Sequence, residues 1–102
     1  MTKQFIEITF GNALAQARQL EACADEMTNL ANRRLSEIQG DIQSAWQGDG
    51  VNAYIDKVNQ TGEGIRATAN KLYRIAETIR NAARIFRDTE LKALEIAQQR
   101  TY

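Results

Sequence analysis

The side chains that most often carry out chemistry in proteins are scarce in this sequence. It contains no histidine and a single cysteine, Cys23, so the usual general base and a cysteine-only zinc site are both excluded. Acidic residues are numerous, but pairs such as Asp25-Glu26 have no histidine, metal-ligand spacing or glycine-rich phosphate loop beside them. The sequence therefore predicts no catalytic residue, no metal site and no cofactor. Cys23 is expected to be a small buried residue beside Ala24.

Length and charge exclude further classes of protein. The chain has 102 residues, one domain at most, and its 13 basic and 13 acidic side chains balance, which argues against nucleic acid as a partner. No apolar run approaches the roughly 18 residues of a membrane span, and residues 1–10 lack the apolar stretch of a secretory signal peptide. We expect a non-enzymatic protein that is cytoplasmic, or that is exported by a route that reads no N-terminal signal.

The positions of the apolar residues predict two long helices. The chain contains no proline, and from about Asn12 its apolar residues advance by three or four positions along one face, so a first helix is expected over 12–44. Looser alternation before it predicts an extended arm over 1–11. A second helix is expected over 51–97, followed by a tail over 98–102.

A turn is predicted over residues 45–50, between the two helices. Gly48 and Gly50 flank Asp49, which is typical of a tight reversal, and Gly48 can take the left-handed backbone that ends a helix. The sequence therefore predicts one all-α domain over 1–102, folded as an antiparallel two-helix hairpin.

The predicted second helix carries two rows of residues that each repeat every seven positions. The large row consists of Val51, Val58, Ile65, Leu72, Ile79 and Phe86. The small row consists of Ile55, Gly62, Ala69, Ala76, Ala83, Glu90 and Ala97. Together the rows form a heptad seam for helix packing or dimerisation, and the small row allows the partner backbone to approach closely.

Several large apolar side chains lie off this seam. They are Leu30, Tyr54, Tyr73, Ile75, Ile85, Leu94 and Ile96. A helix of about 45 residues is about 68 Å long, so the hairpin is expected to be a rod, and a bare apolar row along it would be unusual for a soluble monomer. Scattered exposed apolar residues are ordinary, but two hairpins packed into an elongated four-helix bundle would cover the row. We expect a homodimer, or a pair with a related helical hairpin.

The residues at the turn resemble a known family. A short chain with Trp46-Gln47-Gly48 at its midpoint, between two long helices and eight positions before Tyr54, resembles the WXG family of the early secretory antigenic target type. The resemblance covers nearly the whole chain. It implies a protein of Gram-positive or mycobacterial cells, exported as a folded dimer by a type VII secretion system without a cleaved signal peptide. The secretion ATPase would then be a partner.

The resemblance also implies an export signal in two parts, in which the turn at Trp46-Gln47-Gly48 lies beside a C-terminal motif of the partner chain. In the family, the C-terminal motif is an aromatic or apolar residue, three spacers and an acidic residue, with further apolar residues along the helix. Phe86 and Glu90 match this spacing and are followed by Ala93 and Ala97. Residues four apart project from one helix face, so the pair would offer an apolar knob beside a carboxylate to a pocket with a basic rim. Phe86 replaces the more familiar tyrosine, which points to the variants of the system found in Firmicutes.

Glu90 falls on the small row, where a buried carboxylate would be costly, so the seam is expected to open there. Two other functions stay open. The chain could be a cytoplasmic adaptor that pairs with the helical N-terminal domain of a larger type VII toxin, or a structural coiled-coil subunit unrelated to secretion.

Overall fold

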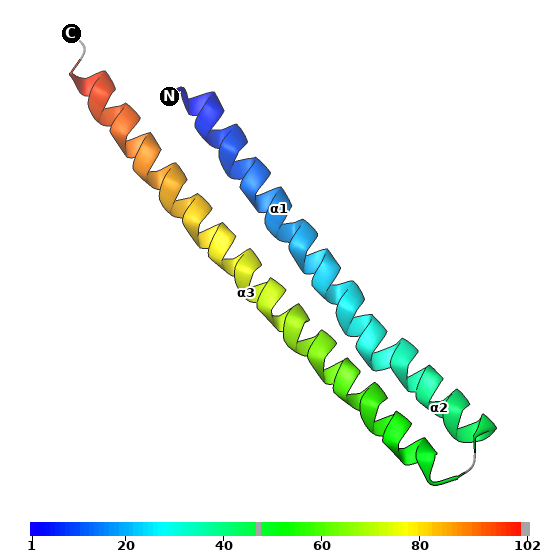
Figure 1. The fold of residues 1–102 in the computed structure, drawn as a ribbon. Helices are drawn as coiled ribbons and strands as arrows, with labels where there is room; N and C mark the ends of the chain where they lie inside the picture. The colour runs from blue at the N-terminus through cyan, green and yellow to red at the C-terminus, as the bar shows by residue number, and fades with distance from the viewer. Residues whose placement is uncertain (47, 101–102) are drawn as a thin grey trace. The chain divides into compact units, whose positions relative to one another are not determined.

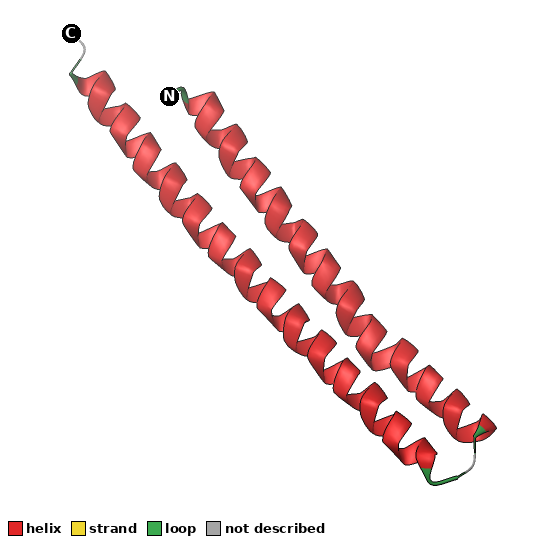
Figure 2. Ribbon diagram, viewed as in Figure 1, coloured by secondary structure: helices red, strands yellow, loops and turns green. Residues whose placement is uncertain are grey.

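The computed structural model describes residues 1–46 and 48–100; Gln47 of the turn motif and residues 101–102 of the expected tail lie outside the described residues. Nearly all of the described chain is helical, and it contains no β-strand (Figures 1 and 2). In chain order the elements are α1 (Lys3–Asn29), the π-helix η1 (Leu30–Arg34), α2 (Leu35–Ala45) and α3 (Gly50–Gln99). The predicted all-α class is confirmed.

The helices of the chain form two compact units. Unit 1 contains Met1–Glu21 and Arg74–Tyr102, and unit 2 contains Ala22–Tyr73. In each unit, a segment from the first half of the chain packs against a segment of α3. In unit 2, contacts join Asn32 to Arg66 and Asp25 to Tyr73, so one partner's number rises as the other's falls. The segments are therefore antiparallel, and the predicted helical hairpin is confirmed.

The extended arm predicted over residues 1–11 is wrong, because α1 already begins at Lys3. Thr2 is the reason. The backbone N–H of Phe5 donates to Thr2 Oγ1 at 3.1 Å, and the N–H of Ile6 donates to the Thr2 carbonyl oxygen at 3.1 Å. This is the N-cap arrangement that satisfies the free amides of a first helical turn. Ile6 is then fully buried on the inner face of α1.

The other helix ends differ from the expected ones by a few residues at most. The first helical stretch ends at Ala45 rather than at 44, and α3 runs from Gly50 to Gln99 rather than over 51–97.

Apart from Ile6, the core of both units is built from small residues. The buried side of the first helical stretch has Ala17, Ala24 and Ala31, and that of α3 has Gly62, Ala69, Ala76 and Ala83. The large row is half-buried along the edge of this core. A Cβ atom added at Gly62 would lie 3.5 Å from Leu35 Cδ1 and 3.9 Å from the Ala31 carbonyl oxygen. Small side chains at the centre therefore let the two backbones of unit 2 approach closely, and the large ones close the sides.

Cys23 is exposed, so its predicted burial is wrong. The buried position belongs to its neighbour Ala24, and successive residues of an α-helix point about 100° apart.

The turn of unit 2 depends on the backbone of Gly48. Helix α2 ends at Ala45, and its C-cap residue Trp46 has an extended backbone (φ −125°, ψ 121°) and donates its N–H to the Ile42 carbonyl oxygen at 2.9 Å. Gly48 has a φ of 139°, in the region that favours glycine. Its carbonyl oxygen accepts a hydrogen bond from the N–H of Val51 at 3.3 Å, which links the turn to the first turn of α3.

Candidate functional site

Two aromatic rings meet at the turn of unit 2. The centroids of Trp46 and Tyr54 are 4.8 Å apart, with the ring planes tilted by 56°. A Cβ atom at Gly50 would lie 3.6 Å from Trp46 Cζ2, so the indole lies over the start of α3. Trp46 is 43% exposed and Tyr54 is 55% exposed. Each ring thus packs on one side and faces solvent on the other.

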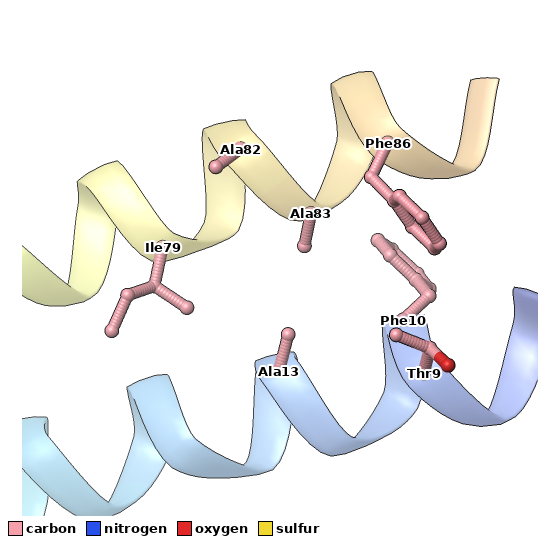
Figure 3. A pocket seen from close by; sticks show the side chains of 7 residues that line it. All are labelled: Thr9, Phe10, Ala13, Ile79, Ala82, Ala83 and Phe86. Carbon is pink, nitrogen blue, oxygen red and sulfur yellow. The ribbon is translucent and has the colours of Figure 1, made fainter. Parts of the chain in front are cut away.

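The predicted export motif lies in unit 1, on the side of α3 that faces α1. Phe86 is half-buried and points into a groove toward Phe10, as Figure 3 shows. It is therefore not a free knob. Glu90 is half-buried and shares a shallow hollow with Met1, Ala93, Leu94 and Ala97. Along the small row, burial falls from Ala83 through Glu90 to the exposed Ala97.

The groove beside Phe86 is apolar. Its volume is about 230 Å³, below the roughly 300–1,000 Å³ of pockets that bind small molecules. It is lined by Thr9, Phe10, Ala13, Ile79, Ala82, Ala83 and Phe86 (Figure 3). A recess of this size and composition fits the apolar side chain of a protein partner better than a substrate.

Polar contacts between the two helical stretches gather on one flank of each unit. They come from a bridging row of α3 that repeats every seven residues: Arg66, Tyr73, Arg80 and Arg87. In unit 2, Arg66 Nη1 donates to Asn32 Oδ1 at 2.8 Å and the Tyr73 hydroxyl donates to Asp25 Oδ1. In unit 1, Arg80 Nη1 donates to Glu21 Oε2 at 2.9 Å, and the Arg87 guanidinium carbon lies 4.2 Å from the centroid of the Phe10 ring. These contacts set the register of the two stretches.

The pair of Glu21 and Arg80 is a charge-assisted contact. The hydrogen bond from Arg80 and, to a smaller extent, its positive charge hold the pKa of Glu21 below its ordinary value, although partial burial opposes this. The same hydrogen bond raises the pKa of Arg80. Sequence reasoning missed the bridging row, although its seven-residue spacing beside the small row was a visible signal.

The opposite flank, which includes the groove, consists of rows without a charged residue. In unit 1 these rows are Thr9, Ala13, Gln16 and Leu20 on α1, and Ile75, Ile79, Ala82, Phe86, Thr89, Ala93 and Ile96 on α3. In unit 2 they are Cys23, Met27, Leu30, Leu35, Ile38 and Ile42, and on α3 Tyr54, Val58, Thr61, Ile65, Thr68 and Leu72. We call these rows the charge-free flank.

Most of the large residues predicted to lie off the seam are exposed. Leu30, Tyr54, Ile75 and Ile96 are between 43% and 55% exposed and belong to the charge-free flank. Ile85 is 66% exposed, but its position in the heptad places it on the outer side of α3. Tyr73 and Leu94 are half-buried.

Neither a metal site nor a membrane span is found where the structure describes the chain. Over residues 1–46 and 48–100, no three His, Cys, Asp or Glu side chains are grouped closely enough to hold a metal ion. None of the described helices combines the length and the apolar character that crossing a bilayer requires.

Comparison with known proteins decides the family. The profile of the WXG100 family, described as proteins of 100 residues with WXG, matches residues 6–91. The chain belongs to the WXG100 family. Searches of curated proteins and of solved structures found no match.

Membership of the WXG100 family indicates a general class of function. It implies a small helical protein of the type VII secretion class, and WXG100 proteins are secreted by type VII systems and are not known as enzymes. They typically form homodimers.

The turn motif at Trp46 and Gly48 belongs to unit 2, and the motif at Phe86 and Glu90 belongs to unit 1.

Proposed function

We propose that this chain is a non-enzymatic protein that pairs with a second copy of itself through the charge-free flank and leaves the cell as a folded dimer. The observation that carries the proposal is the contrast between the two flanks. On one flank of each unit, polar side chains of the bridging row form hydrogen bonds within the chain. The other leaves Leu30, Tyr54, Ile75 and Ile96 exposed on rows that contain no charged residue, and charged residues of the neighbouring rows, such as Arg34 and Lys57, lie at its margin. An apolar surface of this kind marks an interaction site on a soluble protein.

A second copy is a suitable occupant because a flank without charges creates no like-charge repulsion against itself. The net charge of the chain is also zero, so two copies attract or repel each other little at a distance. Two hairpins that pack their apolar flanks together give a four-helix bundle. The groove between Phe10 and Phe86 would receive an apolar side chain of the second copy.

The pairing is tested by light scattering on the purified chain. We expect a particle of about 23 kDa, twice the 11.5 kDa of one chain. Ile75→Glu places a charge on the flank and should shift the protein to the monomer, since burial of an isoleucine is worth about 2 kcal/mol and burial of a charge is costly. Ile85→Glu is the matched control: the same change on the outer side of α3 should leave the dimer intact. Equal effects of the two variants, or a wild-type monomer that assembles only with a co-expressed partner, would contradict the homodimer.

The proposed export signal joins Trp46 and Gly48 of one copy to Phe86 and Glu90 of the other. Its support is the family membership, together with the position of Glu90 where the small row becomes accessible. The type VII secretion ATPase is the expected partner. Because Phe86 is half-buried and lines the groove with Phe10, its removal would disturb the fold, and Glu90 is the cleaner probe.

Export is tested in a cell that carries a type VII system. Glu90→Ala should lower the secreted fraction at least about tenfold, the loss of a charge-assisted contact of about 1.5 kcal/mol, while helix content and dimerisation stay unchanged. Glu95→Ala, the same change five residues further along α3, should be exported normally. Normal export of Glu90→Ala would show that this carboxylate is not part of the signal.

A further inference from the structure

The first helical stretch of unit 2 is interrupted by one wide turn. Residues Leu30–Arg34 form a π-helix, and the backbone N–H of Leu35 donates to the carbonyl oxygen of Leu30, five positions earlier. Such a turn accommodates one extra residue in an α-helix, and single wide turns of this type are frequent at functional sites. The apolar pattern that predicts a continuous helix over 12–44 does not indicate this wide turn.

The wide turn changes which residues face α3. Before it, the buried residues Ala24 and Ala31 are seven positions apart, so an uninterrupted α-helix would place Ile38 next on the inner row. Instead Ile38 is 46% exposed, and the half-buried residue is Gln39, eight positions after Ala31. The inner row has therefore moved by one residue.

The same shift decides which residues continue the charge-free flank. Upstream of the wide turn, the flank contains Met27 and Leu30. Seven-residue spacing from these two would bring Arg34, Asp41 and Glu37 onto the flank. With one residue added, Met27 is followed by Leu35 and Ile42, and Leu30 is followed by Ile38. The three charged residues are all exposed and lie off these rows.

We infer that η1 is a register shift that extends the partner-binding surface over α2. The extra residue takes Glu37 and Asp41 off the rows of the flank and puts Leu35, Ile38 and Ile42 there. Arg34 is moved off the rows as well, to the margin of the flank, where it lines a hollow with Leu30. Its cost is visible at Gln39, a polar residue that takes the inner position an isoleucine could have filled. The core of unit 2 thus contains Gln39 where Ile38 could have packed, and Ile38 lies instead on the surface that a second copy of the chain would contact. The inference rests on the proposed pairing through the charge-free flank.

Two deletions test the register shift independently of pairing. Deletion of Arg33, an exposed residue of η1, should turn the wide turn into an ordinary α-helical turn and keep the rows on both sides in line. We expect its Tm to differ from that of the wild type by less than about 5 °C. Deletion of Arg18, an exposed arginine of α1, should rotate Ala17 and Ile6 off their buried positions and lower Tm by at least about 10 °C. Equal losses in both variants would overturn the proposal, whether or not the chain dimerises.

Two substitutions test the surface. Ile38→Glu should weaken self-association at least about tenfold and leave helix content unchanged, because Ile38 is on the flank and outside the core of unit 2. Glu37→Lys, one residue earlier, should leave self-association unchanged. An unfolded Ile38→Glu variant, or a Glu37→Lys variant with altered association, would place Ile38 on the inner row and overturn the proposal. A wild-type chain that stays monomeric would contradict the proposed function alone, and the deletions would still decide the register.

Discussion

Replacement of Gly62 by alanine should stabilise the protein, although Gly62 is buried on the side of α3 that packs against the first helical stretch of unit 2. The added methyl group would lie 3.5 Å from Leu35 Cδ1, 3.9 Å from the Ala31 carbonyl oxygen and 3.4 Å from Arg66 Nη2, all close to ordinary contact distances. Alanine is favoured over glycine inside a helix by about 1 kcal/mol. For a chain of this size, that gain corresponds to a rise in Tm of about 4–8 °C. Leucine at the same position would press three more carbon atoms against Ala31 and Leu35, at a cost of about 1–3 kcal/mol.

Gly64 provides the control, because nothing lies within 4 Å of a Cβ atom added there. Alanine and leucine should both raise Tm at Gly64, whereas at Gly62 the two substitutions should have opposite signs. Thermal unfolding followed by circular dichroism measures all four variants, at one protein concentration because dimerisation would make Tm concentration-dependent. If leucine were tolerated equally at both positions, the small row would not be where the helices of unit 2 touch. If Gly62→Ala lowered Tm, the space beside Gly62 would be too small for a methyl group, and the expected gain from alanine would be refuted.

Three further predictions concern the turn, the ion pair and the N-cap. Gly48→Ala should lower the free energy of unfolding by about 1–2 kcal/mol in urea titrations, because Gly48 has a φ of 139° that a Cβ atom disfavours. Glu21→Gln should destabilise the protein at pH 7, and its difference from the wild type should close as the pH falls below about 4. The sign follows because the pKa of Glu21 is lowered in the folded state, so its contribution is present above the ordinary carboxyl pKa and is lost on protonation. Thr2→Ala should cost about 1 kcal/mol and speed amide hydrogen exchange in the first turn of α1, since it removes the acceptor for Phe5.

Much of the fold could be predicted because the sequence repeats a few strong signals. Three signals predict the two helices and the turn between them: the absence of proline, apolar residues every three or four positions, and two glycines around Asp49. The start of α1 was missed because the loose alternation of apolar residues over 5–10 favours an extended segment, whereas Thr2 caps a helix there. Where a helix begins can depend on one side-chain hydrogen bond, and the periodicity of apolar residues carries no information about that bond.

The remaining errors arise where one residue decides the register. The π-helix at Leu30–Arg34 leaves a pattern that still reads as helical, since Leu35, Ile38 and Ile42 remain three or four positions apart. Only the packing against α3 reveals that Gln39, not Ile38, faces inward. The position of Phe86 was predicted on the large row, but its partner Phe10 was assigned to the arm, so the groove could not be anticipated.

The bridging row has a consequence for the order in which the chain folds. Its contacts join residues 34, 48 and 59 positions apart, at Asn32–Arg66, Asp25–Tyr73 and Glu21–Arg80. Once a contact nearer the turn has formed, the residues of the next contact are only a few positions further along each helix. The additional loop-closure entropy of that next contact is therefore small. We therefore expect the hairpin to zip from the turn toward the chain ends, and a defect at Gly48 to slow the formation of every later contact. In pulse-labelled refolding, amides near residues 35–60 should gain protection from exchange before those of residues 3–15.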